Sequence, residues 1–172
     1  MDKLKKRFWK YLPEFVYGSI DGTVTTFAII AGIAGAKLNP EIVLILGFSN
    51  VLADGFSMAS SNYLSEESHQ SQHTHLEHTS PWKTALATFF SFIIVGSIPM
   101  ISYVWSFIWP GSITNEFYTA SILTLITFFI IGLIRGNVAH ASKVKTALQT
   151  CSIGIIAALV AYGVGAWLEY IV

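Results

Sequence analysis

Five long apolar stretches constrain the fold of this chain more than any other feature. They run from Pro13 to Ala36, from Pro40 to Ser65, from Trp82 to Trp109, from Phe117 to Arg135 and from Lys145 to Ile171. As an α-helix rising about 1.5 Å per residue, each is long enough to cross about 30 Å of hydrocarbon. Charged residues make up only 12% of the 172-residue chain, about half of what a soluble domain carries. The sequence therefore predicts an all-α integral membrane protein, with residues 1–172 forming one domain of five transmembrane helices.

Prolines mark where the second and third helices should begin. Asn39-Pro40 and Ser80-Pro81 each place a helix-capping residue before a proline, which suits the first turn because its missing N–H is not needed there. Pro99 lies inside the third stretch and should kink that helix. Membrane helices tolerate such a break when neighbouring groups satisfy the freed carbonyl.

The lysines and arginines predict the orientation of the chain. With the N-terminus in the cytoplasm, the cytoplasmic basic residues are Lys3, Lys5, Lys6, Arg7, Lys10, Lys83, Arg135, Lys143 and Lys145. Only Lys37 then lies on the other side. Because cytoplasmic loops of membrane proteins carry most of the Lys and Arg, this bias predicts a cytoplasmic N-terminus and a C-terminus that is outside or in a lumen.

Two carboxylates interrupt the first two stretches. Asp21 lies about 12 Å and Asp54 about 17 Å from the predicted cytoplasmic end of its helix, so both are at similar depth in the inner half of the membrane. An aspartate in the middle of a membrane helix costs about 2.5–3.5 kcal/mol and needs a partner or a hydrated cavity. We therefore interpret both residues as functional.

Each aspartate belongs to a polar face at helical spacing. In the first span this face holds Glu14, Gly18, Asp21, Thr25, Gly32 and Gly35, and in the second it holds Asn50, Asp54, Met58, Ser61, Asn62 and Ser65. Small residues also let membrane helices approach closely. We interpret the following as packing residues of that kind: Ala28, Gly32, Ala36, Gly154, Ala158, Ala161 and Gly165. Packing alone does not explain two carboxylates.

Four segments resemble the vacuolar iron transporter family. They read DGTVTTFAIIAGIAGA, VLADGFSMASSNYLS, PWKTALATFFSFIIVGSIP and ALQTCSIGIIAALVAYGVG, in the family's order and over nearly the whole chain. The resemblance implies a five-helix protomer that forms a homodimer, with a cation path between the two copies lined by Asp21 and Met58. It also implies export of Fe²⁺, and often Mn²⁺, from the cytoplasm to a vacuole or the outside in exchange for protons.

The segment between the second and third spans departs from that family. Many members carry a helical cytoplasmic domain there whose glutamates gather metal, whereas this chain has only SEESHQSQHTHLEHTSPW. Its side chains that can bind metal are Glu66, Glu67, His69, His73, His75, Glu77 and His78. If the second helix continues past the membrane, four of them, at i, i+3, i+7 and i+11 from Glu66, share one face with ligands suited to Fe²⁺, Mn²⁺ or Zn²⁺. This predicts a metal-capture loop, with a solvated polar loop as the alternative.

The two polar faces predict a path for a divalent cation. We expect Asp21 to replace part of the water shell of the cation and Glu14 to concentrate cations at the inner mouth. The residues expected to complete the coordination or line the path are Asp54, Met58, Asn62, Thr25 and Asn50. The thioether of Met58 favours softer transition metals over Mg²⁺ or Ca²⁺. Because a desolvated carboxylate can hold a proton or a cation, proton exchange follows from the same site.

These inferences predict a transporter of Fe²⁺ and Mn²⁺ and not an enzyme. Its expected partners are the metal ion, protons, the lipid bilayer and a second copy of the chain, because one protomer offers few ligands for a six-coordinate ion. We expect no prosthetic group and no nucleic-acid partner. The expected membrane is the cytoplasmic membrane in a prokaryote and the vacuolar membrane in a eukaryote. Two alternatives stay open: a membrane-embedded metalloenzyme, although the chain has no HExxH motif, and a structural membrane protein with packing faces only.

Overall fold

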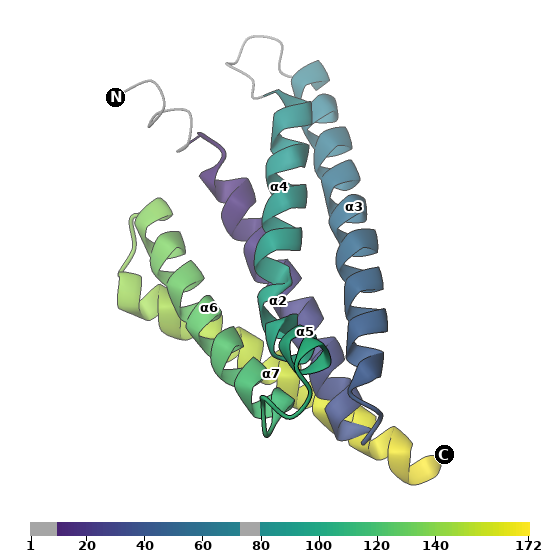
Figure 1. Cartoon of the computed structure of the whole chain (residues 1–172). Helices are drawn as coiled ribbons and strands as arrows, with labels where there is room; N and C mark the ends of the chain where they lie inside the picture. The colour runs from purple at the N-terminus through teal and green to yellow at the C-terminus, as the bar shows by residue number, and fades with distance from the viewer. Residues whose placement is uncertain (1–9, 73–79) are drawn as a thin grey trace.

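The computed structural model describes residues 10–72 and 80–172, and all regular elements in those ranges are helices. They are α2 (Leu12–Gly35), α3 (Glu41–Gln72), α4 (Pro81–Gly96), the 3-10 helix η1 (Ile98–Met100), α5 (Ile101–Ile108), α6 (Glu116–Val138) and α7 (Lys143–Ile171). Figure 1 shows α3 and α4 side by side and α6 beside α7, with α2 running between these pairs. The prediction of an all-α fold is confirmed.

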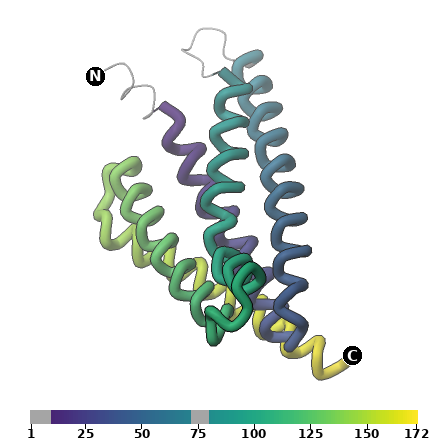
Figure 2. The backbone as a smooth tube through the Cα atoms, viewed as in Figure 1, coloured from purple at the N-terminus to yellow at the C-terminus, as the bar shows by residue number. Residues whose placement is uncertain are grey.

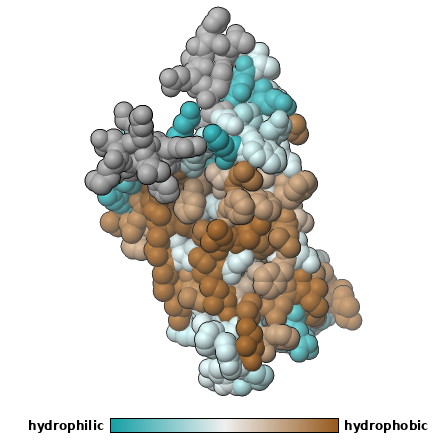
Figure 3. Space-filling model, turned by 45° about the horizontal axis from the view of Figure 1, so that its top comes forward, coloured by the Kyte–Doolittle hydropathy of each residue, from teal (hydrophilic) through white to brown (hydrophobic). Residues whose placement is uncertain are grey.

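Five segments are long and apolar enough to cross a membrane: α2, α3, the unit from α4 to α5, α6 and α7. Figure 3 shows the matching surface, in which an apolar band separates hydrophilic groups gathered towards two ends. The chain is thus a multi-pass membrane protein. The predicted helix boundaries agree with the structure to within three residues at all ends but one. The exception is α3, which continues to Gln72 instead of ending at Ser65.

Pro81 begins a helix and Pro99 interrupts one, as the sequence predicts. Pro81 opens α4 directly after Ser80, although the Ser80 side chain makes no capping hydrogen bond. In the third span, α4 ends at Gly96 and the chain passes through η1, which contains Pro99, before helix resumes in α5. Since proline has no N–H for the helical ladder, this break is the expected kink. It divides the third span into two helical pieces.

Successive spans run in opposite directions, so the start of α2, the end of α3, the start of α4 and the α6–α7 turn share one end of the bundle (Figures 1 and 2). The described basic residues of this end, here called the basic end, are Lys10, Lys83, Arg135, Lys143 and Lys145. Lys37 lies at the opposite end, where its ammonium is 3.2 Å from the Glu169 carboxylate. The charge asymmetry of the sequence therefore separates the two ends of the fold, and the assignment of the basic end to the cytoplasm stays a prediction.

α2 is the central helix, and it contacts α3, α4, α6 and α7. Its closest approach to α4 requires glycine. A Cβ atom on Gly22 would lie 2.7 Å from the Phe92 carbonyl oxygen, and one on Gly96 would lie 2.9 Å from the Gly22 carbonyl carbon. Neither glycine could become alanine without the helices moving apart. Close contact through small residues is the usual way in which membrane helices associate.

Small residues also join α7 to its neighbours. A Cβ atom on Gly165 would meet the Gly32 carbonyl of α2, and one on Gly154 would meet the Phe128 ring of α6. The packing role predicted for Gly32, Gly154 and Gly165 is confirmed. These contacts lie within one chain, so the glycine-rich part of α2 is used to bind α7 of the same protomer.

An apolar core holds the functional helices in register. Phe27 and Ile30 of α2 meet Val51 of α3, Phe92 of α4 and Met100 of η1, and each of these side chains is buried. This cluster fixes α2 and α3 relative to each other. The outward surfaces of α3, α6 and α7 are instead covered with exposed large apolar side chains, as contact with hydrocarbon requires.

Candidate functional site

The two intramembrane aspartates come together between α2 and α3. Asp21 and Asp54 are each partly buried, and their carboxylates are close enough to interact electrostatically. The two helices also contact each other directly. The structure therefore brings together the pair of carboxylates that the sequence placed at similar depth.

Neither aspartate has a partner among the described residues. No hydrogen bond or ion pair from residues 10–72 or 80–172 reaches either carboxylate. Two neighbouring negative charges in a span repel each other, and each would be costly to keep ionised away from water. The pair is therefore suited to hold a proton or a cation.

Two polar side chains extend this site along their helices. The Thr25 hydroxyl donates to the Asp21 carbonyl oxygen at 2.9 Å, so its proton is used and its oxygen can only accept or coordinate. Asn50 lies one turn from Asp54 on α3, and its Nδ2 is buried without a hydrogen-bond partner. Such a buried polar group is uncommon in a folded protein. Both predicted residues therefore lie on the faces that carry the aspartates.

A pocket of about 420 Å³ lies one helical turn from the aspartates towards the basic end, and neither aspartate is among its lining residues. Its lining residues are Tyr17, Ser57, Met58, Ser61, Asn62, Ser65 and Glu66. Met58 is partly buried and also packs against the apolar core, so its thioether lies between the core and the pocket. Four of the predicted polar-face residues of α3, Met58, Ser61, Asn62 and Ser65, therefore line a real cavity.

The hydrogen bonds around Asn62 determine how its amide is oriented. Asn62 Nδ2 donates to Thr88 Oγ1 of α4 at 2.8 Å. The Thr88 hydroxyl itself donates to the Thr84 carbonyl oxygen at 3.0 Å, so its oxygen can only accept from Asn62. The amide nitrogen of Asn62 is thereby held on α4, and its carbonyl oxygen is the atom left to act as a ligand or acceptor.

Carboxylates also mark the basic end of this cavity. Glu66 lines the pocket and accepts a hydrogen bond from Gln70 Nε2 at 3.0 Å. Glu14 of α2 is half-buried, interacts electrostatically with Glu66, and keeps Oε2 buried without a hydrogen-bond partner. The cavity is thus acidic where it approaches the basic end, although the surface around it carries cations.

Two neighbouring helices, α4 and α7, cover parts of the polar face predicted for α2. Gly18 packs against Thr88 and Ser91 of α4, and Gly35 packs against Tyr162 of α7. With Gly32 also against α7, only Glu14, Asp21 and Thr25 of that face remain for a site. This corrects the expectation of one continuous face. Periodicity along a single helix shows which residues share a side, but not which neighbour covers each part.

Two pocket residues were missed by the sequence analysis. Ser57 lies three residues after Asp54 and four before Ser61, so helical spacing alone could have identified it. Tyr17 lies one turn before Asp21, but an aromatic residue near a helix end is normally an interfacial anchor. Its hydroxyl-bearing ring gives α2 a place in the cavity wall.

The predicted capture loop lies only partly within the described residues. Glu66, Glu67 and His69 are on the last turns of α3, so the condition for a shared metal-binding face, a second helix that continues beyond Ser65, is met as far as Gln72. His73, His75, Glu77 and His78 lie outside the described residues. Over residues 10–72 and 80–172, no group of three or more His, Cys, Asp or Glu side chains is arranged to hold a metal ion.

Comparison with known proteins gives a consistent family match. The model of the VIT family matches residues 12–77 and 68–166. "Vacuolar iron transporter" of Plasmodium berghei (strain Anka) is 25% identical over 92% of this chain and 82% of its own length. The protein of the same name from Toxoplasma gondii (strain ATCC 50861 / VEG) is 26% identical over 94% of this chain and 76% of its own. "Vacuolar iron transporter homolog 3" of Arabidopsis thaliana is 26% identical over 94% and 84%.

The lengths of these alignments differ between the relatives. The alignment with the Plasmodium berghei protein runs over 225 positions, so that protein has residues that this 172-residue chain lacks. The alignment with the Arabidopsis protein runs over only 175 positions. The two segments matched by the family model meet at residues 68–77, between the second and third spans. The shortened connection expected from the sequence between these two spans stays a prediction.

Proposed function

Because the chain belongs to the VIT family, we propose that it transports iron, as Fe²⁺, across the membrane that its five spans cross. The observation that carries this proposal is the unpaired couple Asp21 and Asp54 inside the first two spans. Packing needs small residues and not carboxylates, so these charges require a function. The relatives named vacuolar iron transporter supply the cargo.

The transported ion is coordinated first by Asp21. Asp54 lies opposite on α3, and the oriented carbonyl oxygen of Asn62 and the thioether of Met58 follow along the pocket. Oxygen ligands alone would suit Mg²⁺ or Ca²⁺ equally, whereas a sulfur ligand favours borderline metals such as Fe²⁺. Mn²⁺, the harder ion, is carried by the same oxygen ligands. Thr25 and Asn50 line the deeper part of the path.

Proton exchange arises from the same carboxylates. When metal leaves, two adjacent anions away from bulk water cannot both stay ionised without cost, so a proton takes the place of the cation. The acidic pair Glu14 and Glu66 attracts cations to the pocket mouth at the basic end. With that end in the cytoplasm, Fe²⁺ enters from the cytoplasm and leaves on the opposite side as protons move inward.

Two copies of the chain complete the path. The pocket face of α3 carries Ser57, Ser61 and Ser65, all of which are exposed on the single protomer. Exposed hydroxyls at membrane depth are better placed against another helix than against lipid, because lipid offers them no hydrogen bonds. A two-fold partner placed against this face would double the ligand set.

We base the proposed membrane location on the names of the relatives and the proposed route of metal capture on the segment after α3. In a eukaryote the membrane is the vacuolar membrane, as in the names of the relatives, and in a prokaryote it is the cytoplasmic membrane. Because the connection after α3 is short, its Glu and His residues take the place of a larger capture domain. They raise the local concentration of metal without lying on the path.

Uptake into proteoliposomes tests the proposal. Purified protein should carry Fe²⁺ into vesicles faster when the interior is acidic than when no pH gradient is imposed. Metal entry should release protons from the interior. Co²⁺, Zn²⁺ and Mn²⁺ are compared under the same gradient to rank the cargo. If vesicles that hold folded protein show no metal flux with or without the pH gradient, transport is contradicted. Metal flux without proton movement would contradict only the exchange of metal for protons.

A further inference from the structure

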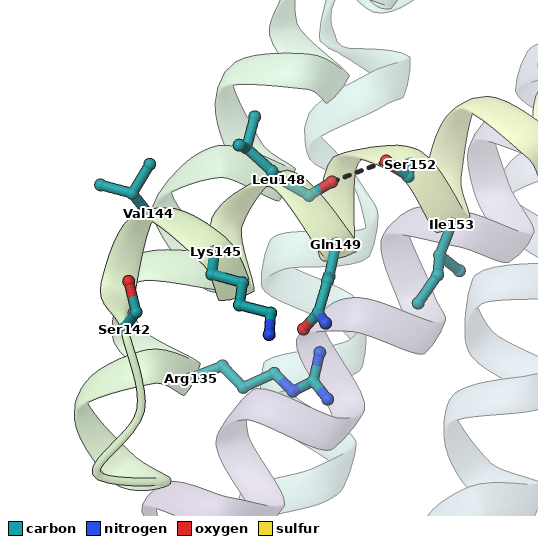
Figure 4. A pocket seen from close by; sticks show the side chains of 8 residues that line it. All are labelled: Arg135, Ser142, Val144, Lys145, Leu148, Gln149, Ser152 and Ile153. Atoms are coloured by element: carbon teal, nitrogen blue, oxygen red, sulfur yellow. Dashed lines mark hydrogen bonds between the residues drawn. The ribbon is translucent and has the colours of Figure 1, made fainter.

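A second polar cavity lies between α6 and α7 at the basic end and shares no lining residue with the carboxylate pocket. It has a volume of about 780 Å³, and its polar lining comes from Arg135, Ser142, Lys145, Gln149 and Ser152. Figure 4 shows the Arg135, Lys145 and Gln149 side chains directed towards the same space. None of the described residues that line this cavity is a carboxylate.

Within the part of the chain that the structure describes, the two cations of this cavity have no ion-pair partner. Among residues 10–72 and 80–172, no ion pair or hydrogen bond engages the Arg135 guanidinium or the Lys145 ammonium. Together with the Gln149 amide they form a set of hydrogen-bond donors, whereas the Ser152 hydroxyl already donates to the Leu148 carbonyl oxygen at 2.8 Å. Arginine matches the oxygens of a phosphate through two parallel N–H groups, and lysine adds a point charge. The cavity is thus complementary to a phosphate.

The surroundings of the cavity match a lipid. Arg135 is one turn from the end of α6 and Lys145 is in the first turn of α7, so both lie where a span meets the headgroup region. Along the same face of α7, the side chains below Lys145 and Gln149 are Ile156, Leu159 and Val160, each more than 60% exposed. Two cationic side chains next to a row of exposed apolar side chains are complementary to a phospholipid, in which an anionic phosphate adjoins apolar acyl chains.

We propose that this cavity, formed by Arg135, Lys145 and Gln149, binds the headgroup phosphate of an anionic phospholipid from the leaflet at the basic end. A zwitterionic lipid brings its own cation towards Arg135 and Lys145, whereas an anionic lipid neutralises them. Basic pockets between transmembrane helices are a known mode of anionic lipid recognition. The bound lipid would fill the open side of the α6–α7 pair at the membrane surface. The proposal does not depend on the transport of iron.

Native mass spectrometry of the full chain tests this site. Protein is released from mixed micelles of phosphatidylglycerol and phosphatidylcholine, and the bound lipids are counted. The wild type should retain phosphatidylglycerol preferentially. The double variant Arg135→Gln/Lys145→Gln should lose this preference by about tenfold or more, which corresponds to losing at least one charge-assisted hydrogen bond. Lys83→Gln/Lys143→Gln, with the same loss of charge at the same end, should keep it.

The controls separate this site from other sources of binding. Equal loss in both double variants, or no preference in the wild type, would overturn the proposal, because general surface charge would then explain the data. Glycerol 3-phosphate is added in a thermal-unfolding assay. Stabilisation equal to that by phosphatidylglycerol would show a soluble phosphate site and overturn the lipid proposal too. Lys145→Gln alone, at an exposed position, gives the same test if the double variant does not fold.

Discussion

At the scale of single residues, the charge of Asp21 is the feature on which transport depends most. Asp21→Asn keeps the size of the side chain and one acceptor oxygen but removes the charge that both Fe²⁺ and the proton need. Iron flux in proteoliposomes should fall by about 100-fold or more. Mutating a residue that only hydrogen-bonds to a metal ligand typically lowers activity by about 10- to 100-fold, and loss of the ligand itself should cost at least as much. Stability should be unchanged or higher, because an amide costs less to bury than a carboxylate.

Glu169→Gln is the matched control for this change. It makes the same acid-to-amide substitution at the opposite end, where the exposed pair with Lys37 contributes little to stability. Its flux should equal that of the wild type. Wild-type iron flux and proton coupling in Asp21→Asn would instead make Asp21 a packing residue, and the proposed path would be wrong.

The sulfur of Met58 should determine which metal is preferred. Met58→Leu keeps the volume but removes the thioether, so the free energy of unfolding should change by less than about 1.5 kcal/mol. The ratio of Fe²⁺ to Mn²⁺ flux should fall, because the remaining ligands are oxygens that favour the harder ion. Competition between the two metals in proteoliposomes measures this ratio. Met100→Leu, in the buried core and away from the pocket, should leave the ratio unchanged, and an equal shift in both variants would contradict the role of Met58.

Residue identity could be predicted from the sequence better than residue contacts. The aspartates stood out because a charge inside an apolar stretch is costly, and this needs no knowledge of the neighbours. The amide of Asn62 is oriented by Thr88, 26 positions away on another helix, and no local pattern could reveal that bond. Gly18 was assigned to the polar face, yet it packs against α4. A glycine has no side chain by which the sequence could show what it faces.

At the scale of helices, the contact of α2 with α4 should tolerate no added methyl group at Gly22. Gly22→Ala forces Cβ against the Phe92 carbonyl oxygen of the backbone, which cannot rotate away. Overpacking of this kind should cost about 1–3 kcal/mol. Thermal unfolding in detergent, followed by the tryptophan fluorescence, measures the loss as a lower midpoint. Gly163→Ala is the control, because no atom lies within 4 Å of its added Cβ. A midpoint equal to that of the wild type in Gly22→Ala would contradict the close contact.

The orientation of the spans can be tested by labelling from each side. In a Cys151→Ala background, a cysteine at Ser71 at the end of α3 should react with a membrane-impermeant maleimide only from the cytoplasmic side. A cysteine at Ser112, in the α5–α6 connection, should react only from outside. The physical reason is the concentration of Lys and Arg at the basic end. The reverse pattern would contradict both the orientation and the proposed direction of export.

Helix boundaries followed from the sequence because hydropathy and proline are local signals. Pro81 and Pro99 identified the start of α4 and the break in the third span. The sequence analysis ended this helix too early, at Ser65, because it took the end of the apolar stretch as the end of the helix. The polar segment from Glu66 to Gln72 leaves the apolar region but contains no glycine or proline to stop the helix.

At the scale of the whole molecule, the exposed polar face of α3 indicates that one protomer is not the complete unit. Large apolar side chains cover the outer surfaces of α6 and α7, as lipid contact requires, whereas α3 also exposes serines beside its pocket. A partner on this face would bury those hydroxyls and bring a second Asp21 and Met58 to the path. The glycines of α2 are already used against α4 and α7 of the same chain, so α3 and not those parts of α2 is the face to test.

Single cysteines along α3 should therefore crosslink two copies in bilayers. In the Cys151→Ala background, Ala53→Cys, Ser57→Cys and Ser61→Cys are introduced one at a time, and oxidation should give a dimer at one or more of these positions. Ile126→Cys, also at an exposed position but on α6, should stay monomeric because that face contacts lipid. Wild-type dimers should also appear in native mass spectrometry without crosslinking. If all three α3 variants remain monomeric in vesicles that still transport Fe²⁺, the path lies within one protomer, and Asp21 and Asp54 must bind the ion without a partner's help.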